Sequence, residues 1–223
     1  MNFRKLFGLD RQEPKTGIHA VSFSDFGWKK RAQSADEISW IDPSYPAVLS
    51  INYFELVPDV PYDSTVEELR DFYRPMVTRS GGGLIKVGVI DIQNVRCIET
   101  IFKLPRDEGG VLYIGALTIP FVDRSYVIKI QAIEPGDTGL REAMIWPQLD
   151  AAGTVSIDNE TGNIIGWSAD PYDKTVTEGL LMNLAEAAHY DAQFPSHPLS
   201  VVRAKLEEII KSVRLSPELL QGV

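Results

Sequence analysis

The stretch from residue 84 to residue 134 constrains the fold more than any other part of the sequence. It contains extended segments, rich in β-branched and aromatic residues, that are separated by turn-forming residues. The four segments cover residues 84–91, 95–104, 111–119 and 124–134. Their connections are too short for helical crossovers, so neighbouring strands must run antiparallel. The pattern therefore predicts an antiparallel meander.

Side chains in the last of these segments alternate in character. Tyr126, Ile128 and Ile130 fall on one face of the expected strand, and Lys129 and Gln131 fall on the other. Such alternation is typical of an antiparallel sheet with one face packed against a core. We expect the helix that precedes the meander to cover this apolar face.

That helix is predicted over residues 64–79. Ser64 and Glu67 have the spacing of a capping box, in which the two side chains satisfy backbone N–H groups reciprocally. Pro75 is expected to kink the helix or to end it near Tyr73, because proline lacks an N–H and disfavours helix before it. The apolar stripe consists of Val66, Leu69, Phe72, Tyr73, Met76 and Val77.

Two more helices are predicted to close the chain. The first begins at Thr175, whose spacing to Glu178 repeats the capping box. The second begins at Pro198, a favourable first helical residue. Their apolar stripes are Val176, Leu180, Leu181, Leu184 and Ala188, and Leu199, Val202, Leu206, Ile209 and Val213. The other expected elements are strands at 17–26 and 47–57, a loop at 135–153 with one helical turn at 140–145, and a hairpin of 154–158 with 163–168.

Together these elements predict an α+β fold, with an antiparallel β-sheet meander covered by a helix from the N-terminal half and two C-terminal helices. Residues 1–16 are interpreted as a basic leader, and residues 17–223 as a single domain. Within that domain, residues 47–134 form the expected core, and residues 154–215 contribute the C-terminal hairpin and helices.

Charge and cysteine content limit the classes of function. The net charge is −9, although residues 1–31 carry seven Lys or Arg against three acids, so the rest of the chain has a net charge of −13. An acidic body repels the phosphate backbone, which disfavours nucleic-acid binding and favours a protein partner, including a basic one. The single cysteine and the absence of a signal-peptide core or transmembrane stretch predict a cytoplasmic protein.

No recognised catalytic motif is present, and no cofactor or metal is predicted. Glycines 81–83 follow a helix and precede a strand, so they are interpreted as a helix cap and not as a phosphate-binding loop. Cys97 lies in the middle of a strand and is expected to be a buried apolar residue. His189 and His197 flank Asp191, but their spacing favours structural roles at helix ends over a metal site.

The loop at 135–150 is the best candidate for a contact surface, because long loops on a rigid scaffold often carry function. The tryptophans at loops and element ends are either binding anchors or plugs at the ends of the sheet, and the second interpretation is favoured. The acids near residue 170 are interpreted as turn formers, with a catalytic pair as the alternative. The candidate binding residues are Arg141, Glu142, Trp146, Trp167, Asp170 and Tyr172.

The order of elements resembles the Mog1/PsbP-like α/β/α sandwich. The resemblance covers about half of the chain, from Thr65-Val66-Glu67-Glu68-Leu69 to Gly83 and from Cys97-Ile98-Glu99-Thr100 to Ile133. Members of that fold are mostly non-enzymatic binding proteins, including photosystem extrinsic subunits, a Ran-binding factor and small bacterial proteins. The resemblance implies a binding module and assigns no functional residue. The chain after residue 150 departs from the compact members.

Three functions follow as hypotheses. The first is a non-catalytic protein-binding or accessory module, such as an immunity-type factor for a basic partner. The alternative is a small-molecule-binding protein or enzyme with a pocket between the sheet and the C-terminal helices. The third is membrane-surface attachment through the leader, where Phe3, Leu6 and Phe7 accompany Arg4 and Lys5. The oligomeric state is left open.

Overall fold

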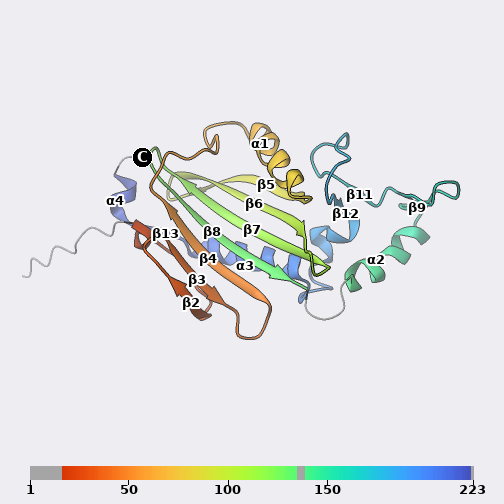
Figure 1. Ribbon diagram of the computed structural model, residues 1–223, viewed down its shortest axis with the longest axis horizontal. Helices are drawn as coiled ribbons and strands as arrows, with labels where there is room; N and C mark the ends of the chain where they lie inside the picture. Colours follow the sequence, from red (N-terminus) through yellow and green to blue (C-terminus); the bar gives the residue numbers. More distant parts are fainter. Residues whose placement is uncertain (1–16, 135–138, 222–223) are drawn as a thin grey trace, which may run out of the picture.

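The computed structural model describes residues 17–134 and 139–221. Its centre is a seven-stranded antiparallel sheet in the order β2-β3-β4-β8-β7-β6-β5 (Figure 1). The strands are β2 (Lys29–Gln33), β3 (Glu37–Ile41), β4 (Ala47–Phe54), β5 (Gly83–Ile92), β6 (Val95–Pro105), β7 (Val111–Pro120) and β8 (Ser125–Ile133). The predicted α+β class and the meander of β5 to β8 are confirmed. The leader expected at residues 1–16 lies outside the described residues.

Two helices cover opposite faces of the sheet. Helix α3 (Pro198–Ser212) packs on β7 and β8, and α1 (Val66–Arg79) packs on β5 and β6. Figure 1 shows α3 running behind the strands and α1 beside β5. The apolar face of β8 was expected to lie under the helix at 64–79, and this is wrong, because Ile128 and Ile130 share a core with Val202 and Leu206 of α3.

The reason for this arrangement lies in β7. A Cβ added at Gly115 would lie 2.7 Å from Cγ1 of Val202, so the missing side chain lets α3 approach the sheet closely. Helix α1 instead leads directly into β5 and packs on the strands nearest to it. Its Leu69 and Val77 form a smaller core with Ile98 and other residues of β5 and β6.

Helix α1 differs from its prediction at the N-terminal end and matches the predicted end at residue 79. Its cap is Thr65, not Ser64: Thr65 and Glu68 form the capping box, one residue later than expected. The helix continues through Pro75 to Arg79, so the alternative in which it ends near Tyr73 is wrong. The glycine run then caps it as predicted, because Gly81 has a φ of +71° and Gly82 donates its N–H to the carbonyl of Val77.

The helix predicted from Thr175 is wrong. Thr175 donates its hydroxyl to Asp173 and forms a turn. Gly179 has a φ of +83°, and a Cβ there would lie 2.2 Å from the carbonyl oxygen of Gly82. The backbone therefore passes too close to the start of β5 for a helix to form. The segment instead contains β12 (Met182–Asn183) and the 3-10 turns η3 (Leu184–Glu186) and η4 (Ala188–Tyr190).

Most of the remaining elements are short, and α2 is longer than expected. The helical turn predicted at 140–145 extends to a full helix, α2 (Leu140–Ala151), and the predicted hairpin consists of β9 (Ser156–Ile157) and β10 (Ile164–Ile165). The β2–β3 hairpin was not predicted. The other elements are η2 (Gly17–Ala20), β1 (Val21–Ser22), β11 (Ser168–Ala169), β13 (Arg214–Leu215) and α4 (Pro217–Leu220).

Candidate functional site

Exposed apolar side chains gather on an arm formed by α2 and the β9–β10 hairpin. Figure 1 shows α2 and β9 at the right-hand end of the molecule, beyond the strands of the sheet. Five of its apolar side chains are more than half exposed, namely Leu140 (60%), Met144 (54%), Ile157 (55%), Ile164 (52%) and Ile165 (54%). Ile157 and Ile164 are cross-strand partners, so they share one face of the hairpin. Clustered apolar exposure of this kind is typical of an interaction surface.

The exposed charge on the arm is negative. Asp150 and Glu160 are exposed, Asp158 is half-buried, and the one basic side chain between residues 140 and 165, Arg141, is buried. Backbone N–H groups of Glu160 and Thr161 donate to Asp158 and lower the pKa of its carboxyl group, which keeps that group ionised. The arm thus combines exposed isoleucines with an acidic rim, a combination that suits a partner that is both apolar and basic.

Arg141, predicted as a contact residue, lies inside the molecule with 1% of its surface exposed. Its guanidinium donates to the carbonyl oxygens of Ala185 (2.6 Å) and Ala187 (3.0 Å), to Asp191 Oδ1 (3.0 Å) and to Ser200 Oγ (3.0 Å). These bonds join α2 to the 3-10 turns and to the start of α3. In this structure Arg141 anchors the arm to the body.

Three other predicted residues lie along the same junction. Trp146 and Trp167 are partly buried and make an edge-to-face contact, with ring centroids 5.2 Å apart. Glu142, beside Arg141, accepts a hydrogen bond of 3.4 Å from the Asn183 side chain. The junction therefore brings Arg141, Glu142, Trp146 and Trp167 into one region, and their role in binding stays a prediction.

Asp170 and Tyr172 lie at a different place, against α1 and β5. Asp170 accepts backbone N–H groups from Tyr172 and Asp173, and Arg74 Nε donates to it at 3.1 Å, which matches the expected turn-forming role. The Tyr172 hydroxyl accepts the N–H of Val87 at 2.8 Å. These two residues fasten the chain to the β5 edge of the sheet.

A buried ionic cluster lies beneath the arm's anchor, and the sequence analysis missed it. Glu186 is fully buried, and both of its carboxylate oxygens accept from Lys103 Nζ, at 2.7 and 2.8 Å. The Tyr113 hydroxyl and the Asn183 N–H also donate to it, each at 2.7 Å. Burial, followed by the nearby Glu186 charge, raises the pKa of Tyr113, so its hydroxyl remains a donor. The sequence signal of this cluster was Lys103, a lysine between the apolar residues Phe102 and Leu104 of strand β6.

His197 caps α3 next to Arg141. Its Nδ1 accepts the N–H of Leu199 at 3.3 Å, which requires that nitrogen to be unprotonated. Burial, followed by the positive charge of Arg141, lowers the pKa of His197 to about 3. The other charged groups that act on it are Asp191, which favours the protonated form, and Arg203 and Lys103, which oppose it. His197 is therefore neutral at physiological pH.

We expect this histidine to make the fold acid-sensitive. The unfolded state takes up the His197 proton near pH 6.5, and the folded state only near pH 3, so the free energy of unfolding should fall between these values by up to about 1.4 kcal/mol per pH unit. Chemical denaturation from pH 7 to pH 4 measures this slope. The control is His197→Asn, which keeps a capping acceptor and cannot titrate, and its slope should be smaller. Equal slopes for the two proteins would contradict the assignment.

Neither metal binding nor thiol chemistry gains support. In the described ranges, no group of three or more His, Cys, Asp or Glu side chains could hold a metal ion. His189 packs on Tyr190, and His197 is committed to its cap. Cys97 is fully buried, as expected, and this burial raises the pKa of its thiol to about 12.

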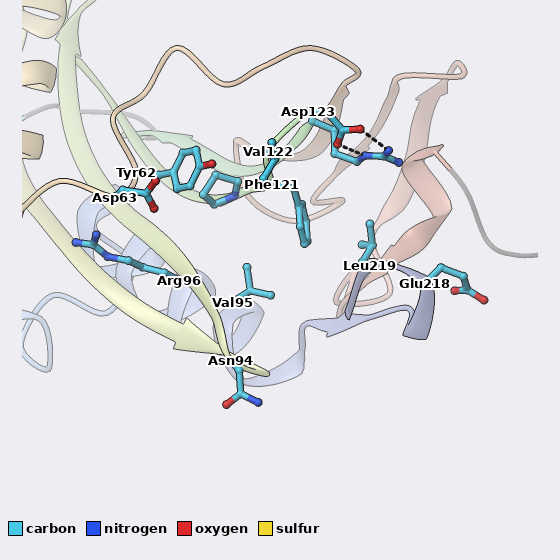
Figure 2. Close-up of a pocket in the computed structure, with 12 residues that line it drawn as sticks. Tyr62, Asp63, Asn94, Val95, Arg96, Phe121, Val122, Asp123, Glu218 and Leu219 are labelled. Carbon is cyan, nitrogen blue, oxygen red and sulfur yellow. Dashed lines mark hydrogen bonds and ion pairs between the residues drawn. The ribbon is translucent and has the colours of Figure 1, made fainter. Parts of the chain in front are cut away.

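A cavity of about 570 Å³ lies at one end of the sheet (Figure 2). Tyr62, Val95, Phe121 and Leu219 contribute its apolar surface. Its rim carries charged groups of both signs. Asp123 and Arg124 form an ion pair with two hydrogen bonds, each of 2.8 Å, and Arg96 donates to the carbonyl of Ser64. Asp63 and Glu218 add two carboxylates. None of the six predicted binding residues lines this cavity.

Across residues 17–134 and 139–221, the helices are all too short or too polar to cross a membrane. No protein-family model matches the sequence, and no curated protein matches it either.

Solved structures do match. The Ran-binding protein Mog1p of Saccharomyces cerevisiae is 10% identical with a TM-score of 0.43, and the match covers 92% of this chain and 96% of that one. PsbP from Synechocystis sp. PCC 6803 is 12% identical with a TM-score of 0.36, over 59% of this chain and 85% of that one. A Bacteroides thetaiotaomicron protein is 9% identical with a TM-score of 0.35, over 52% of this chain, and this chain spans only 39% of its length. The expected resemblance to the Mog1/PsbP-like fold is confirmed as a likeness of fold, and it carries nothing about activity.

Proposed function

We propose that this protein is a non-catalytic protein-binding module, and that its arm contacts a partner with an apolar and basic surface. The observation that carries the proposal is the exposure of Met144, Ile157, Ile164 and Ile165 on one projecting element with an acidic rim. A two-stranded hairpin is marginally stable alone, so unsupported isoleucines on both of its strands do little for folding. Burial against a partner would give them a role.

The arm is held firmly although its surface is exposed. Arg141 fixes the start of α2, and the contact between Trp146 and Trp167 joins the helix to the strand segment that follows the hairpin. A rigid, pre-positioned apolar surface loses little conformational entropy on binding. This arrangement supports a docking element over a loosely attached loop.

The test compares three proteins as baits in affinity capture from extracts of the native host, at low and at high salt. The arm variant carries Ile157→Thr, Ile164→Thr and Ile165→Thr, which keep β-branched side chains and thus strand propensity. The matched control carries Leu56→Thr and Val57→Thr, two exposed apolar residues outside the arm. We expect wild type and control to enrich the same protein, and the arm variant to bind it about tenfold or more weakly.

The partner's charge is tested on the captured protein. Asp150→Lys with Glu160→Lys reverses two exposed charges of the arm, and it should slow association and reduce the salt dependence of binding. Capture that is equal for the wild type and the arm variant would refute the proposal, and so would a failure to enrich any protein at either salt concentration.

The cavity in Figure 2 supports a second candidate function, the binding of a small amphipathic molecule. Its volume falls in the range of ligand pockets, and it combines an apolar floor with a few polar groups. Fragment screening by NMR against wild type and Leu219→Trp, which fills the cavity, tests this candidate. Fragments that bind only the wild type would support it, and fragments that bind both equally would exclude it.

A further inference from the structure

The free edge of the sheet at β2 carries a row of basic side chains. All five residues of β2 are exposed, and three of them are Lys29, Lys30 and Arg31. Within the described part of the chain, none of these three forms an ion pair with a carboxylate, and Lys30 donates to the side chain of Gln33 at 2.8 Å. A strip of uncompensated positive charge thus lies on a chain whose net charge is −9.

The backbone of this edge is open as well. Ser34 donates its N–H to the Glu37 carbonyl at 2.7 Å, so these two residues occupy a hydrogen-bonded position of the β2–β3 ladder. The next pair, Gln33 and Ile38, must then be a non-hydrogen-bonded pair. The N–H and C=O groups of Gln33 therefore point away from β3, outward from the sheet.

The opposite edge of the sheet is closed by its own chain. At β5, the Tyr172 hydroxyl occupies the outward N–H of Val87, and Leu180 donates its N–H to the Gly82 carbonyl just before the strand. Nothing in the described part of the chain covers β2 in this way. The two edges differ, and β2 is the open one: its register with β3 shifts between Lys30 and Ala32, so the regular edge available to another strand lies at the Gln33 end.

We infer that the β2 edge binds an extended acidic segment of a partner protein, which adds to the sheet as a further strand. The outward backbone groups would supply main-chain hydrogen bonds, and the three cations would select for Asp and Glu. Pairing of β2 with β2 of a second copy would place like charges opposite one another, which is unfavourable. The same charges that prevent self-association therefore favour an acidic strand.

This inference goes beyond the proposed function, because it concerns a second surface and a partner of opposite charge. Figure 1 places β2 at the lower left and the arm at the right, so the two surfaces are far apart in the molecule. Each can therefore be altered without touching the other.

The test uses a set of fluorescent ten-residue peptides in which Glu or Asp alternates with Val, Thr, Tyr or Phe. Fluorescence anisotropy measures their binding to the 223-residue protein. The ligand control is a set of peptides with the same charge and with proline at alternate positions, which cannot form a strand. Vesicles with and without phosphatidylserine distinguish an acidic strand from an anionic membrane.

Two variants distinguish the contribution of the main-chain hydrogen bonds to binding from the contribution of the three positive charges. Gln33→Pro removes one outward N–H and leaves the β2–β3 ladder intact, and it should weaken the best peptide about three- to tenfold. Its matched control, Gln33→Ala, loses the same side chain and should bind like wild type. Lys29→Glu with Lys30→Glu and Arg31→Glu should weaken binding about tenfold or more. Circular dichroism and thermal unfolding verify that each variant is folded.

The inference is overturned if no peptide of the set binds wild type, or if the proline-containing peptides bind equally well. It is also overturned if Gln33→Pro binds as Gln33→Ala does. Vesicle binding that depends on the three basic residues but is unchanged in Gln33→Pro would assign the edge to a membrane surface instead. None of these outcomes depends on the arm, so failure here would leave the proposed function standing.

Discussion

Replacement of Glu186 by glutamine is expected to lower the free energy of unfolding by about 3–5 kcal/mol, because it leaves the Lys103 ammonium buried without a counter-ion. Lys103 is 2% exposed and Glu186 is 0% exposed, so water cannot take over the role of the lost charge. The substitution also weakens the bonds from Tyr113 and Asn183, which now meet a neutral side chain. Urea denaturation followed by fluorescence of the tryptophans measures the change.

A double variant provides the control for this prediction. Lys103→Met combined with Glu186→Gln removes both charges, and it should be more stable than Glu186→Gln alone, since no unpaired charge remains buried. If the loss of stability in the double variant, relative to wild type, equalled the sum of the losses in Lys103→Met and Glu186→Gln, the two side chains would not be coupled. The contact of 2.7 Å would then have no energetic meaning.

Replacement of Arg141 by alanine is expected to cost a similar amount, about 3–5 kcal/mol. The change leaves a cavity and removes the donors to the carbonyl groups of Ala185 and Ala187 inside the molecule. Asp191 keeps Arg203 as a partner, at 2.9 Å, so part of the network should survive. Denaturation gives the loss of stability, and limited proteolysis should show faster cleavage in the arm than in wild type.

Glu142→Ala is the matched control for Arg141→Ala. Glu142 is the next residue of α2, is only partly buried and makes one long hydrogen bond, of 3.4 Å. Its replacement should change stability by less than about 1 kcal/mol. Equal stability of the two variants would contradict the role of Arg141 as the anchor of the arm.

The sequence predicted best what depends on local patterns. Strands β5 to β8 combine β-branched residues with short turns, and the stripe of α3 repeats with helical spacing, so each was visible without its neighbours. The β2–β3 hairpin was missed because β2 is polar throughout and has no apolar alternation to detect. Its strand conformation comes from pairing with β3, which a local pattern does not record.

The errors arose where distant residues decide the local structure. Thr175 and Glu178 have capping-box spacing, yet the approach of Gly179 to Gly82, almost a hundred residues earlier in the chain, prevents the helix. Arg141 was expected at the surface because it lies in the segment 135–150, which was predicted to be a long loop that carries function. Its partners, Ala185 to Ser200, lie more than forty residues further along the chain. The sequence therefore indicated residues at the base of the arm, and it missed the exposed side chains of Met144, Ile157, Ile164 and Ile165.

The most direct test of the protein-binding function is hydrogen–deuterium exchange of this protein with and without the partner that it captures. We expect slower exchange in α2 and across residues 156–165 when the partner is bound, with little change in the sheet strands β6 to β8, which are already protected. Unchanged exchange in the arm, with new protection confined to the cavity at the other end of the sheet, would contradict the assignment of the arm as the binding surface.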